Sequence, residues 1–443
     1  MNKFNMIPIS KELIENICIE NGLPAAGSGS IREVSHLVDL IEEKTGIRYV
    51  RMEMGVPGLP APEIGIEAEI TALKNGKASL YPDISGIPSL KEEASRFIKL
   101  FLNVHIKPQG CIPTVGSMMG GMATFLVANR NDRTKEGTLF IDPGFPVQKQ
   151  QVKMLGHNYH SFDVYNFRGK KLRAKLESYL ETGKISSLLY SNPNNPAWIC
   201  LNDEELQVIG ELASKYNVIV IEDLAYFGMD FRKDYSTPGK PPYQPTIAHY
   251  TDDYVLLISS SKMFSYAGQR IGIMAISDQL FTKSYPDLLR YYSSDKYGHS
   301  VIYGALYALS AGVCHSAQFG LAALLKAVND GTYKYRGDVI EYGNKAAIMK
   351  SLFINNNFAI TYDTDLDVPI ADGFYFTVSY SAMKGKDLLR ELLRYGISAI
   401  TLDITGSERE GLRACVSMVS REQLGDLEVR LKKFSEDHPV LKP

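Results

Sequence analysis

The sequence predicts an α/β fold in which the strands of a largely parallel sheet alternate with crossover helices. The first observation is a set of short apolar runs, bounded by turn residues, that are typical of buried parallel strands. These runs are Thr138–Asp142, Ile185–Ser191, Val218–Glu222, Val255–Ser259 and Ile271–Ile276. Three of them begin at positions 185, 218 and 255, that is 33 and 37 residues apart, which leaves room for a helix between each pair.

The second observation is the helical pattern between these runs. In Asp203–Lys215, apolar residues recur every three or four positions from Leu206 onward, which places them on one helix face. Asn202 or Asp203 can cap this helix. Ser89–Leu102 shows the same amphipathic pattern. Strands and helices together predict an open α/β domain over roughly residues 55–330.

The C-terminal part predicts a smaller α+β domain, which we expect to pack with an N-terminal helix. Its predicted elements are the strands Gly373–Tyr380 and Gly411–Ser417, the helices Lys384–Tyr395 and Arg421–Phe434, and the N-terminal helix Ile31–Lys44. A long helical stretch, Val301–Leu325, is expected to join the two parts. The predicted boundaries are 1–54 and 331–443 for the smaller domain and 55–330 for the larger one.

Composition indicates an ordinary globular protein. Of 443 residues, 45% are hydrophobic and 22% charged, which argues against global disorder and against a small disulfide scaffold. A net charge of −2 gives no general attraction for nucleic acid or an anionic membrane. The N-terminus lacks the apolar core of a secretory signal, no run approaches a membrane span, and the five cysteines are scattered. We therefore expect a cytoplasmic protein.

Chemically active side chains follow the predicted strands. Ligands of open α/β sheets bind beyond the carboxyl ends of the strands, so these side chains are expected to converge at one sheet edge. They are Phe145 after the first run, Asn195 after the second, Asp223 and Tyr226 after the third, and Lys262 and Arg270 after the fourth. A lysine can form a Schiff base with an aldehyde, and a carboxylate can keep a pyridine nitrogen protonated. An arginine with hydroxyl groups can bind phosphate, so the set describes a pyridoxal-phosphate site.

At this level of detail the sequence resembles the class I/II aminotransferases, which have the aspartate aminotransferase-like fold type I. The resemblance covers most of the chain and is carried by SGSIREV from Ser28, GVPGLP from Gly55, YPDISG from Tyr81, NPNNP from Asn192, DLAY from Asp223, the SxSK(x)7R arrangement from Ser259 to Arg270, and Arg413. It implies a mostly parallel seven-stranded sheet in a large cofactor domain with helices on both faces. A smaller α+β domain would be made from both chain ends.

The resemblance also implies roles for single residues. Lys262 would form the internal aldimine with pyridoxal 5'-phosphate and move a proton between the substrate α-carbon and cofactor C4′. Asp223 would pair with the pyridine nitrogen. Tyr226 and Asn195 would hydrogen-bond the ring hydroxyl oxygen, and Phe145 would stack on the ring.

The remaining roles concern the phosphate, the substrate and a second subunit. Ser259, Ser261, Arg270 and the backbone of Gly116, Ser117 and Met118, which precede the helical stretch Met119–Ala128, would bind phosphate. Arg413, with Asn195 and Gly55, would bind the substrate, Arg413 through its α-carboxylate. Tyr81 and Ser300 resemble residues that family members contribute to the neighbouring subunit's site.

Two features leave alternatives open. Ala197 and Trp198 stand where the family has a small residue and glycine, so Trp198 either fills substrate space or packs on the next helix. Lys296 lies where dicarboxylate-specific relatives place a cation, but a solvated surface lysine is the more ordinary reading. His157 and His160 have no third ligand at a suitable spacing, so no metal site is expected.

These features predict a pyridoxal-phosphate-dependent aminotransferase that acts as a homodimer. It would move an amino group from an amino acid to a 2-oxo acid by a ping-pong mechanism. A carbon–sulfur β-lyase shares the same early chemistry and is the main alternative. A non-catalytic sensor module is disfavoured, because only about 30 residues precede Ser28–Val34 and this segment is not basic, unlike the DNA-binding domain that such regulators carry.

Overall fold

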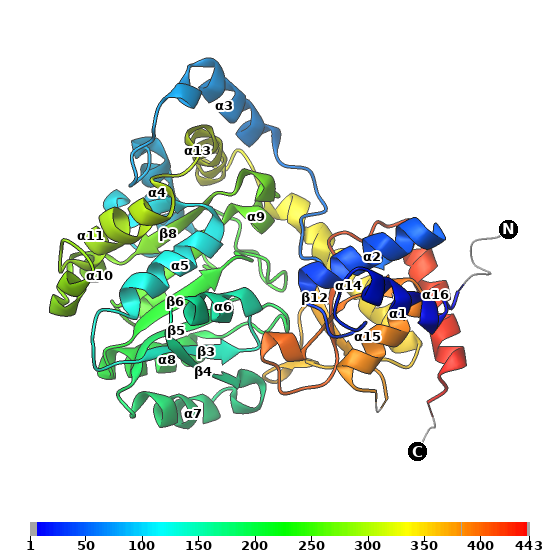
Figure 1. Cartoon of the computed structure of the whole chain (residues 1–443). Helices are drawn as coiled ribbons and strands as arrows, with labels where there is room; N and C mark the ends of the chain where they lie inside the picture. Colours follow the sequence, from blue (N-terminus) through cyan, green and yellow to red (C-terminus); the bar gives the residue numbers. More distant parts are fainter. Residues whose placement is uncertain (1–6, 382, 441–443) are drawn as a thin grey trace. The chain divides into compact units, whose positions relative to one another are not determined.

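The computed structural model of the chain describes residues 7–381 and 383–440, and they form two units (Figure 1). The sheet unit comprises Leu59–Asn194 and Cys200–Val339. The terminal unit comprises the described parts of Met1–Gly58 and Ile340–Pro443 and, between the two halves of the sheet unit, the short segment Asn195–Ile199. Each unit is described by itself.

The terminal unit is α+β and is built from both ends of the described chain. Its helices are α1 (Lys11–Glu20), α2 (Ile31–Thr45), α15 (Gly385–Arg394), α16 (Gln423–Asp437) and most of α14 (Arg336–Asn355). A four-stranded antiparallel sheet has the order β14 (Ile400–Thr401), β15 (Leu412–Cys415), β12 (Tyr375–Ser379), β9 (Ala359–Ile360). The terminal unit also contains two separate two-stranded sheets. One pairs β1 (Val50–Arg51) with β13 (Ile397–Ser398), and the other pairs β10 (Thr364–Asp365) with β11 (Val368–Pro369).

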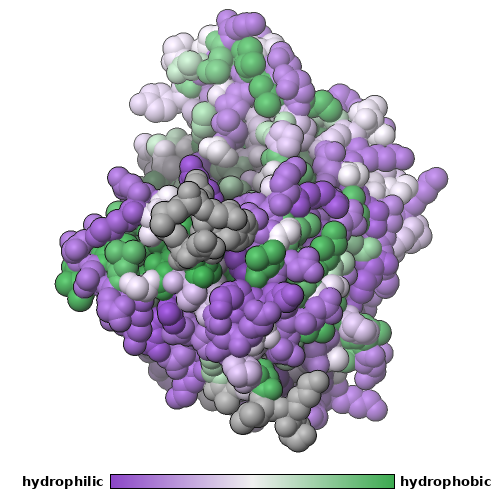
Figure 2. Space-filling model, turned by 90° about the vertical axis from the view of Figure 1, so that its right-hand side faces the viewer, coloured by the Kyte–Doolittle hydropathy of each residue, from purple (hydrophilic) through white to green (hydrophobic). Residues whose placement is uncertain are grey.

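Hydrogen bonds join the N-terminal and C-terminal segments within the terminal unit. Ile9 N donates to Arg394 O at 2.7 Å, and Tyr49 OH donates to Leu393 O at 2.6 Å. Hydrophilic side chains cover most of the molecular face drawn in Figure 2, and apolar side chains lie there in separate patches. Within residues 7–381 and 383–440, no helix is both long and apolar enough to span a bilayer.

The sheet unit contains the predicted seven-stranded, mostly parallel sheet. Its order is β2 (Cys111–Thr114), β8 (Gly272–Ile276), β7 (Tyr254–Ser259), β6 (Ile219–Leu224), β5 (Ile185–Ser191), β3 (Gly137–Asp142), β4 (Asn158–Asp163). The five strands from β7 to β4 are parallel to one another, which confirms the predicted fold class.

One strand was predicted in the wrong direction. The run Ile271–Ile276 was expected to be parallel, but β8 is antiparallel to both β7 and β2. Between Ser259 and Gly272 the chain forms only the four-residue helix α9 (Ser260–Met263) and a 3₁₀ turn. A parallel crossover needs a longer connection, so the chain turns back instead.

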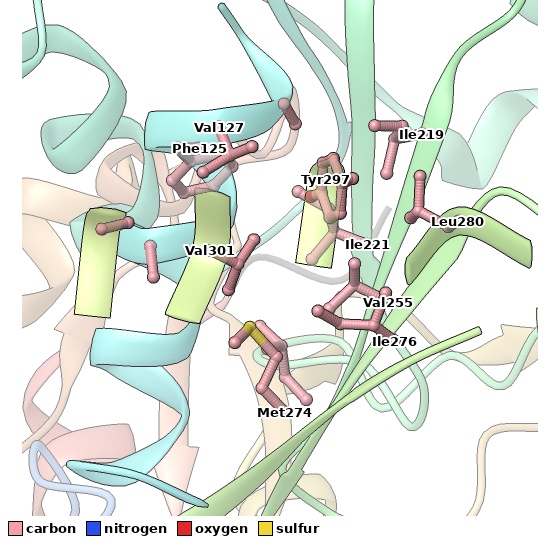
Figure 3. Packing of buried hydrophobic residues seen from close by; sticks show 14 of the residues in the cluster. Phe125, Val127, Ile219, Ile221, Val255, Met274, Ile276, Leu280, Tyr297 and Val301 are labelled. Atoms are coloured by element: carbon pink, nitrogen blue, oxygen red, sulfur yellow. The ribbon is translucent and has the colours of Figure 1, made fainter. Parts of the chain in front are cut away.

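Helices cover both faces of this sheet. The remaining helices of the sheet unit are α3 (Glu63–Lys74), α4 (Pro88–Leu102), α5 (Gly116–Ala128), α6 (Pro146–Met154), α7 (Lys171–Leu180), α8 (Asp203–Lys215), α10 (Asp278–Thr282), α11 (Tyr297–His299), α12 (Tyr307–Ser310) and α13 (His315–Asn329). On one face, α5 and the segment Ser300–Leu306 pack on strand residues that include Ile219, Ile221 and Val255 (Figure 3). On the other, the 3₁₀ turn Ile247–His249 hydrogen-bonds to β6 and packs against α8.

The predicted long helix Val301–Leu325 is interrupted, and it does not join the two units. Ser300–Leu306 is π-helical, α12 ends at Ser310, and α13 begins at His315. Ala311 and Gly312 between them have φ values of +54° and +124°, which an α-helix excludes. All of these residues belong to the sheet unit, and α14 is the helix that crosses from one unit to the other.

Candidate active site

The carboxyl edge of the sheet brings together residues that are far apart in the sequence. Asp223 at the end of β6 lies beside Ser191 of β5 and Leu257 of β7. Gly272 at the start of β8 lies between Ser259 of β7 and Thr114 of β2. The predicted residues that follow these strands therefore share one edge, as parallel topology requires.

Asp223 is a buried carboxylate held by two donors. Gln148 Nε2 of α6 donates to its Oδ2 at 2.8 Å, and the N–H of Ala225 donates to its Oδ1 at 3.1 Å. Burial raises the pKa of Asp223 to about 6, although these two hydrogen bonds act to lower it. Such a group favours a cationic or N–H-bearing partner, which would compensate for the lost hydration.

Next to this carboxylate, three chain segments form a cradle that suits an anion. Helix α5 begins at Gly116, and the first N–H groups of a helix have no acceptor within it. Gly116 has φ +66°, a conformation that favours glycine, and a Cβ atom there would lie 2.7 Å from Arg270 Nη2, so the guanidinium lies directly against the start of the helix. Ser259 contributes its hydroxyl, which accepts a hydrogen bond from the N–H of Ser261 at 3.2 Å.

Helix α6 links the cradle to the buried carboxylate. Gln148 reaches Asp223, and Gln151, one turn later, donates through Nε2 to the carbonyl of Met118 in the first turn of α5 at 2.9 Å. The spacing of three residues places both amides on the same face of α6. One rigid helix thus fixes the predicted ring-nitrogen partner relative to the predicted phosphate site.

The other predicted cofactor residues of the sheet unit follow the strands that end at this edge. Lys262 is partly buried on α9, three positions after Ser259. Tyr226 is buried two residues after the end of β6. Phe145 is half-buried and is the residue from which α6 starts.

In the terminal unit, Arg413 on β15 is buried. Its Nη2 donates to the carbonyl of Glu53 at 2.5 Å, and its Nη1 donates to Asn195 Oδ1 at 3.3 Å. The guanidinium carbon lies 4.5 Å from the centre of the Tyr375 ring. Among the described residues, none forms an ion pair with Arg413.

The nearby carboxylate of Glu53 is already engaged. Arg51 Nε donates to its Oε1 at 2.9 Å, and Ser398 Oγ donates to its Oε2 at 2.6 Å. A buried guanidinium whose neighbours offer only neutral acceptors is suited to an anionic ligand, because burying an uncompensated charge is costly. This cluster therefore fits the predicted role of Arg413 toward a carboxylate.

Gly55 and Trp198 pack against the same aromatic residue. A Cβ atom on Gly55 would lie 2.0 Å from Tyr375 Oη. The ring of Trp198 is fully buried, and its centroid lies 6.2 Å from that of Tyr375. The Trp198 ring therefore lies against the β12 region of the terminal unit.

The residues expected to serve a second subunit behave differently from one another. Tyr81 is 93% exposed. Ser300, in contrast, is fully buried, and its hydroxyl donates to the carbonyl of Ser294 at 2.9 Å. The roles of Ser300 and Tyr81 toward a second subunit stay predictions. Lys296 is exposed and donates to Ser284 Oγ.

Several contributors were missed by sequence reasoning. Gln148 and Gln151 lie on a short polar helix whose composition carries no catalytic signal, and Glu53 contributes only a backbone carbonyl to Arg413. Tyr375 lies in a run predicted as a strand, where an aromatic residue is normally interpreted as part of the hydrophobic core. The alternation of side chains along a strand indicates only that Tyr375 and Arg413 can face the same side.

Comparison with known proteins identifies the family. A model of the family "Aminotransferase class I and II" matches residues 51–431, which is most of the chain. The chain therefore belongs to the aminotransferase class I and II family, and the resemblance found in its motifs is confirmed.

Individual relatives are distant. The chain is 26% identical over 235 residues to a probable aspartate aminotransferase of Methanocaldococcus jannaschii, a match that spans 52% of this chain and 58% of that protein. It is 24% identical to the putative aminotransferase YugH of Bacillus subtilis over 83% of this chain and 86% of that one. The solved structure of a double mutant of Thermus thermophilus aspartate aminotransferase superposes with a TM-score of 0.73 at 15% identity, covering 92% of this chain and 96% of that one. At that identity the likeness establishes the fold.

Proposed function

We propose that the protein is a pyridoxal 5'-phosphate-dependent aminotransferase that moves an amino group between an amino acid and a 2-oxo acid. The observation that carries this proposal is the sheet edge where a buried carboxylate, an anion cradle and Lys262 follow neighbouring strands. Membership of the aminotransferase class I and II family supports the same conclusion.

The residues present fit the cofactor. Asp223 offers a buried anionic acceptor for a protonated ring nitrogen. The cradle of Gly116, Ser259 and Arg270 offers backbone N–H groups, hydroxyls and a guanidinium to a phosphate. Tyr226 and Asn195 are the proposed donors to the ring hydroxyl oxygen, and Phe145 is the proposed stacking residue.

When bound, the cofactor supplies an electron sink that stabilises negative charge at the substrate α-carbon. Lys262 would hold the cofactor through its Nζ and, once displaced by a substrate amine, would move a proton to and from the α-carbon. Arg413 would hold the α-carboxylate through a bidentate pair and so orient the α-carbon. Amino acid and 2-oxo acid would use these residues in turn, which is the basis of a ping-pong course. We propose a homodimer as the working unit, with the exposed Tyr81 reaching the second copy.

The cofactor claim is tested by the visible absorbance of the purified, cofactor-loaded protein. We expect Lys262→Ala to lose the visible band of the lysine-bound cofactor while keeping the fold. The exposed Lys233 provides a matched control, and Lys233→Ala should leave the spectrum unchanged. An unaltered band in Lys262→Ala would contradict the assignment.

The reaction is tested by a half-reaction screen across the common amino acids. Conversion of the cofactor to its amine form, reversed by a 2-oxo acid, supports the aminotransferase. Release of ammonia and pyruvate without an acceptor would support the β-lyase instead.

A further inference from the structure

Three side chains of the terminal unit form a continuous series. The rings of Trp198 and Tyr375 meet edge to face, with centroids 6.2 Å apart and planes at 66°. The Tyr375 ring lies in turn 4.5 Å from the Arg413 guanidinium carbon, within the range of a cation–π contact. We call Trp198 and Tyr375 the aromatic pair.

Two glycines make room for this pair. A Cβ atom on Gly373 would lie 1.9 Å from Cε2 of Trp198, and one on Gly55 would lie 2.0 Å from the hydroxyl oxygen of Tyr375. Any larger residue at these positions would collide with an aromatic ring or its hydroxyl. Both rings therefore fill spaces that the surrounding backbone leaves for them.

The backbone of Trp198 is itself constrained. Its φ is +64°, a left-handed conformation that is rare for a bulky residue. Such a conformation persists only when the surroundings impose it, and it recurs near functional sites. The full burial of the ring against Gly373 and Tyr375 provides that constraint.

The contacts of Arg413 divide into two kinds. The carbonyl of Glu53 and Oδ1 of Asn195 fix the rotation of the guanidinium within its own plane, and the Tyr375 ring fixes the plane itself. Nε of Arg413 is buried and has no hydrogen-bond partner among the described residues. That nitrogen is therefore left for a ligand, and a planar carboxylate is the ligand that a fixed guanidinium edge recognises.

We propose that Trp198 and Tyr375 are positioning residues that hold Arg413 in the orientation required by the α-carboxylate. This inference rests on the proposed function, and it adds two residues to which the family motifs assign no such role. The pair would act on carboxylate recognition, because it contacts Arg413 within the terminal unit. Trp198 is the only tryptophan of the sequence, so its fluorescence would report whether a carboxylate ligand is bound near Arg413.

The test uses cofactor-loaded protein and two substrates: the amino acid that it converts fastest, and the amine that lacks only the α-carboxylate. We expect Tyr375→Leu and Trp198→Leu to lower kcat/KM for the amino acid about tenfold, mainly through KM, and to leave the amine within about twofold. Tyr375→Phe keeps the ring and should restore most of the loss. Phe376→Leu, on the same strand but packed on Phe353, is the matched control and should change neither substrate.

Equal losses for amino acid and amine would overturn the proposal, because they would show a structural role. Unchanged kinetics in both leucine variants would overturn it as well. If no amino acid reacts, the proposed function fails, and binding of 2-oxoglutarate measured by Trp198 fluorescence still decides the inference. Saturable binding that weakens about tenfold in Tyr375→Leu but not in Phe376→Leu supports it, and equal binding in all three proteins overturns it.

Discussion

Burial and hydrogen bonding act in opposite directions on Asp223. Removal from water raises its pKa to about 6, while Gln148 Nε2 and the N–H of Ala225 favour the ionised form. The carboxylate is therefore ionised at neutral pH and becomes protonated under mildly acidic conditions. A cationic partner would bind the ionised form and not the neutral acid.

This balance predicts a pH-dependent affinity for the cofactor. As the pH falls through 6, Asp223 takes up a proton, so binding of pyridoxamine phosphate should weaken by about tenfold per pH unit below that point. Equilibrium dialysis between pH 5 and pH 8 measures this dependence without requiring turnover.

Asp223→Asn is the matched control, because it keeps the shape and removes the titration. This variant should bind pyridoxamine phosphate more weakly at pH 8. Its affinity should not show the fall below pH 6 that is expected for the natural protein. Parallel curves for the two proteins would show that Asp223 does not contact the ring nitrogen.

At the residue scale, sequence reasoning predicts the location of a side chain where its position next to a strand already limits that location. Lys262, Asp223 and Arg270 were predicted because each directly follows or precedes a strand that the apolar pattern reveals. Tyr375 and Gln148 were missed because their contacts, to Arg413 and Asp223, arise from side-chain packing between elements distant in sequence. The hydrogen bond from the Ser300 hydroxyl to the carbonyl of Ser294 was likewise not predictable from a local pattern.

At the element scale, the central strands and the amphipathic helices were predictable, and the sheet margins were not. β5, β6 and β7 are buried along almost their full length, so they appear as apolar runs. β2 has four residues including a proline, and β4 is exposed at alternate positions, so neither gives an apolar run. The direction of β8 depends on the short connection before it, which apolar patterns do not encode.

Helix α8 gives a prediction at this scale, because its start is fixed by a capping box. Asn202 Oδ1 accepts from the N–H of Glu205 at 2.9 Å, and Glu205 Oε2 accepts from the N–H of Asn202 at 3.2 Å. Asn202→Ala should destabilise the protein by about 1 kcal/mol, since one helix donor loses its acceptor. The midpoint of urea unfolding measures the loss.

Asn202→Asp retains a capping oxygen and should stay within about 0.5 kcal/mol of the natural protein. Equal losses for the alanine and aspartate variants would mean that the cap does not contribute to stability. The N-cap Asn202 lies three residues after Ile199, the last residue before the chain re-enters the sheet unit.

At the scale of the whole molecule, the pleat of β6 separates two consecutive carboxylates. Asp223 shares the α5 face with Ile219 and Ile221, and Glu222 points to the opposite face. There Glu222 accepts hydrogen bonds from Tyr190 OH at 3.0 Å, from Thr246 Oγ1 and from the N–H of Ile247 at 3.2 Å. These neutral donors offset burial only in part, and the pKa of Glu222 is raised to about 7.

The stability of the whole chain should therefore fall as the pH rises toward 7. The folded protein keeps the Glu222 proton up to about pH 7, whereas the unfolded chain releases it near 4.5, so the unfolded state binds fewer protons in this window. The contribution of Glu222 is most favourable below pH 4.5 and is lost by about pH 7. The shift corresponds to about 3 kcal/mol, and Asp142 and Asp223, whose pKa values burial raises to about 6, act in the same direction.

Glu222→Gln isolates the share of this one group. The amide keeps the size of the side chain and cannot ionise, so the variant should gain stability relative to the natural protein as the pH rises from 5 to 8, by up to about 3 kcal/mol. Urea unfolding at several pH values gives the difference directly, and Glu204→Gln, on the exposed start of α8, controls for loss of a carboxylate at the surface. A constant difference between Glu222→Gln and the natural protein across this range would mean that Glu222 does not hold its proton in the folded state. The three donors around it would then stabilise the carboxylate more strongly than burial destabilises it.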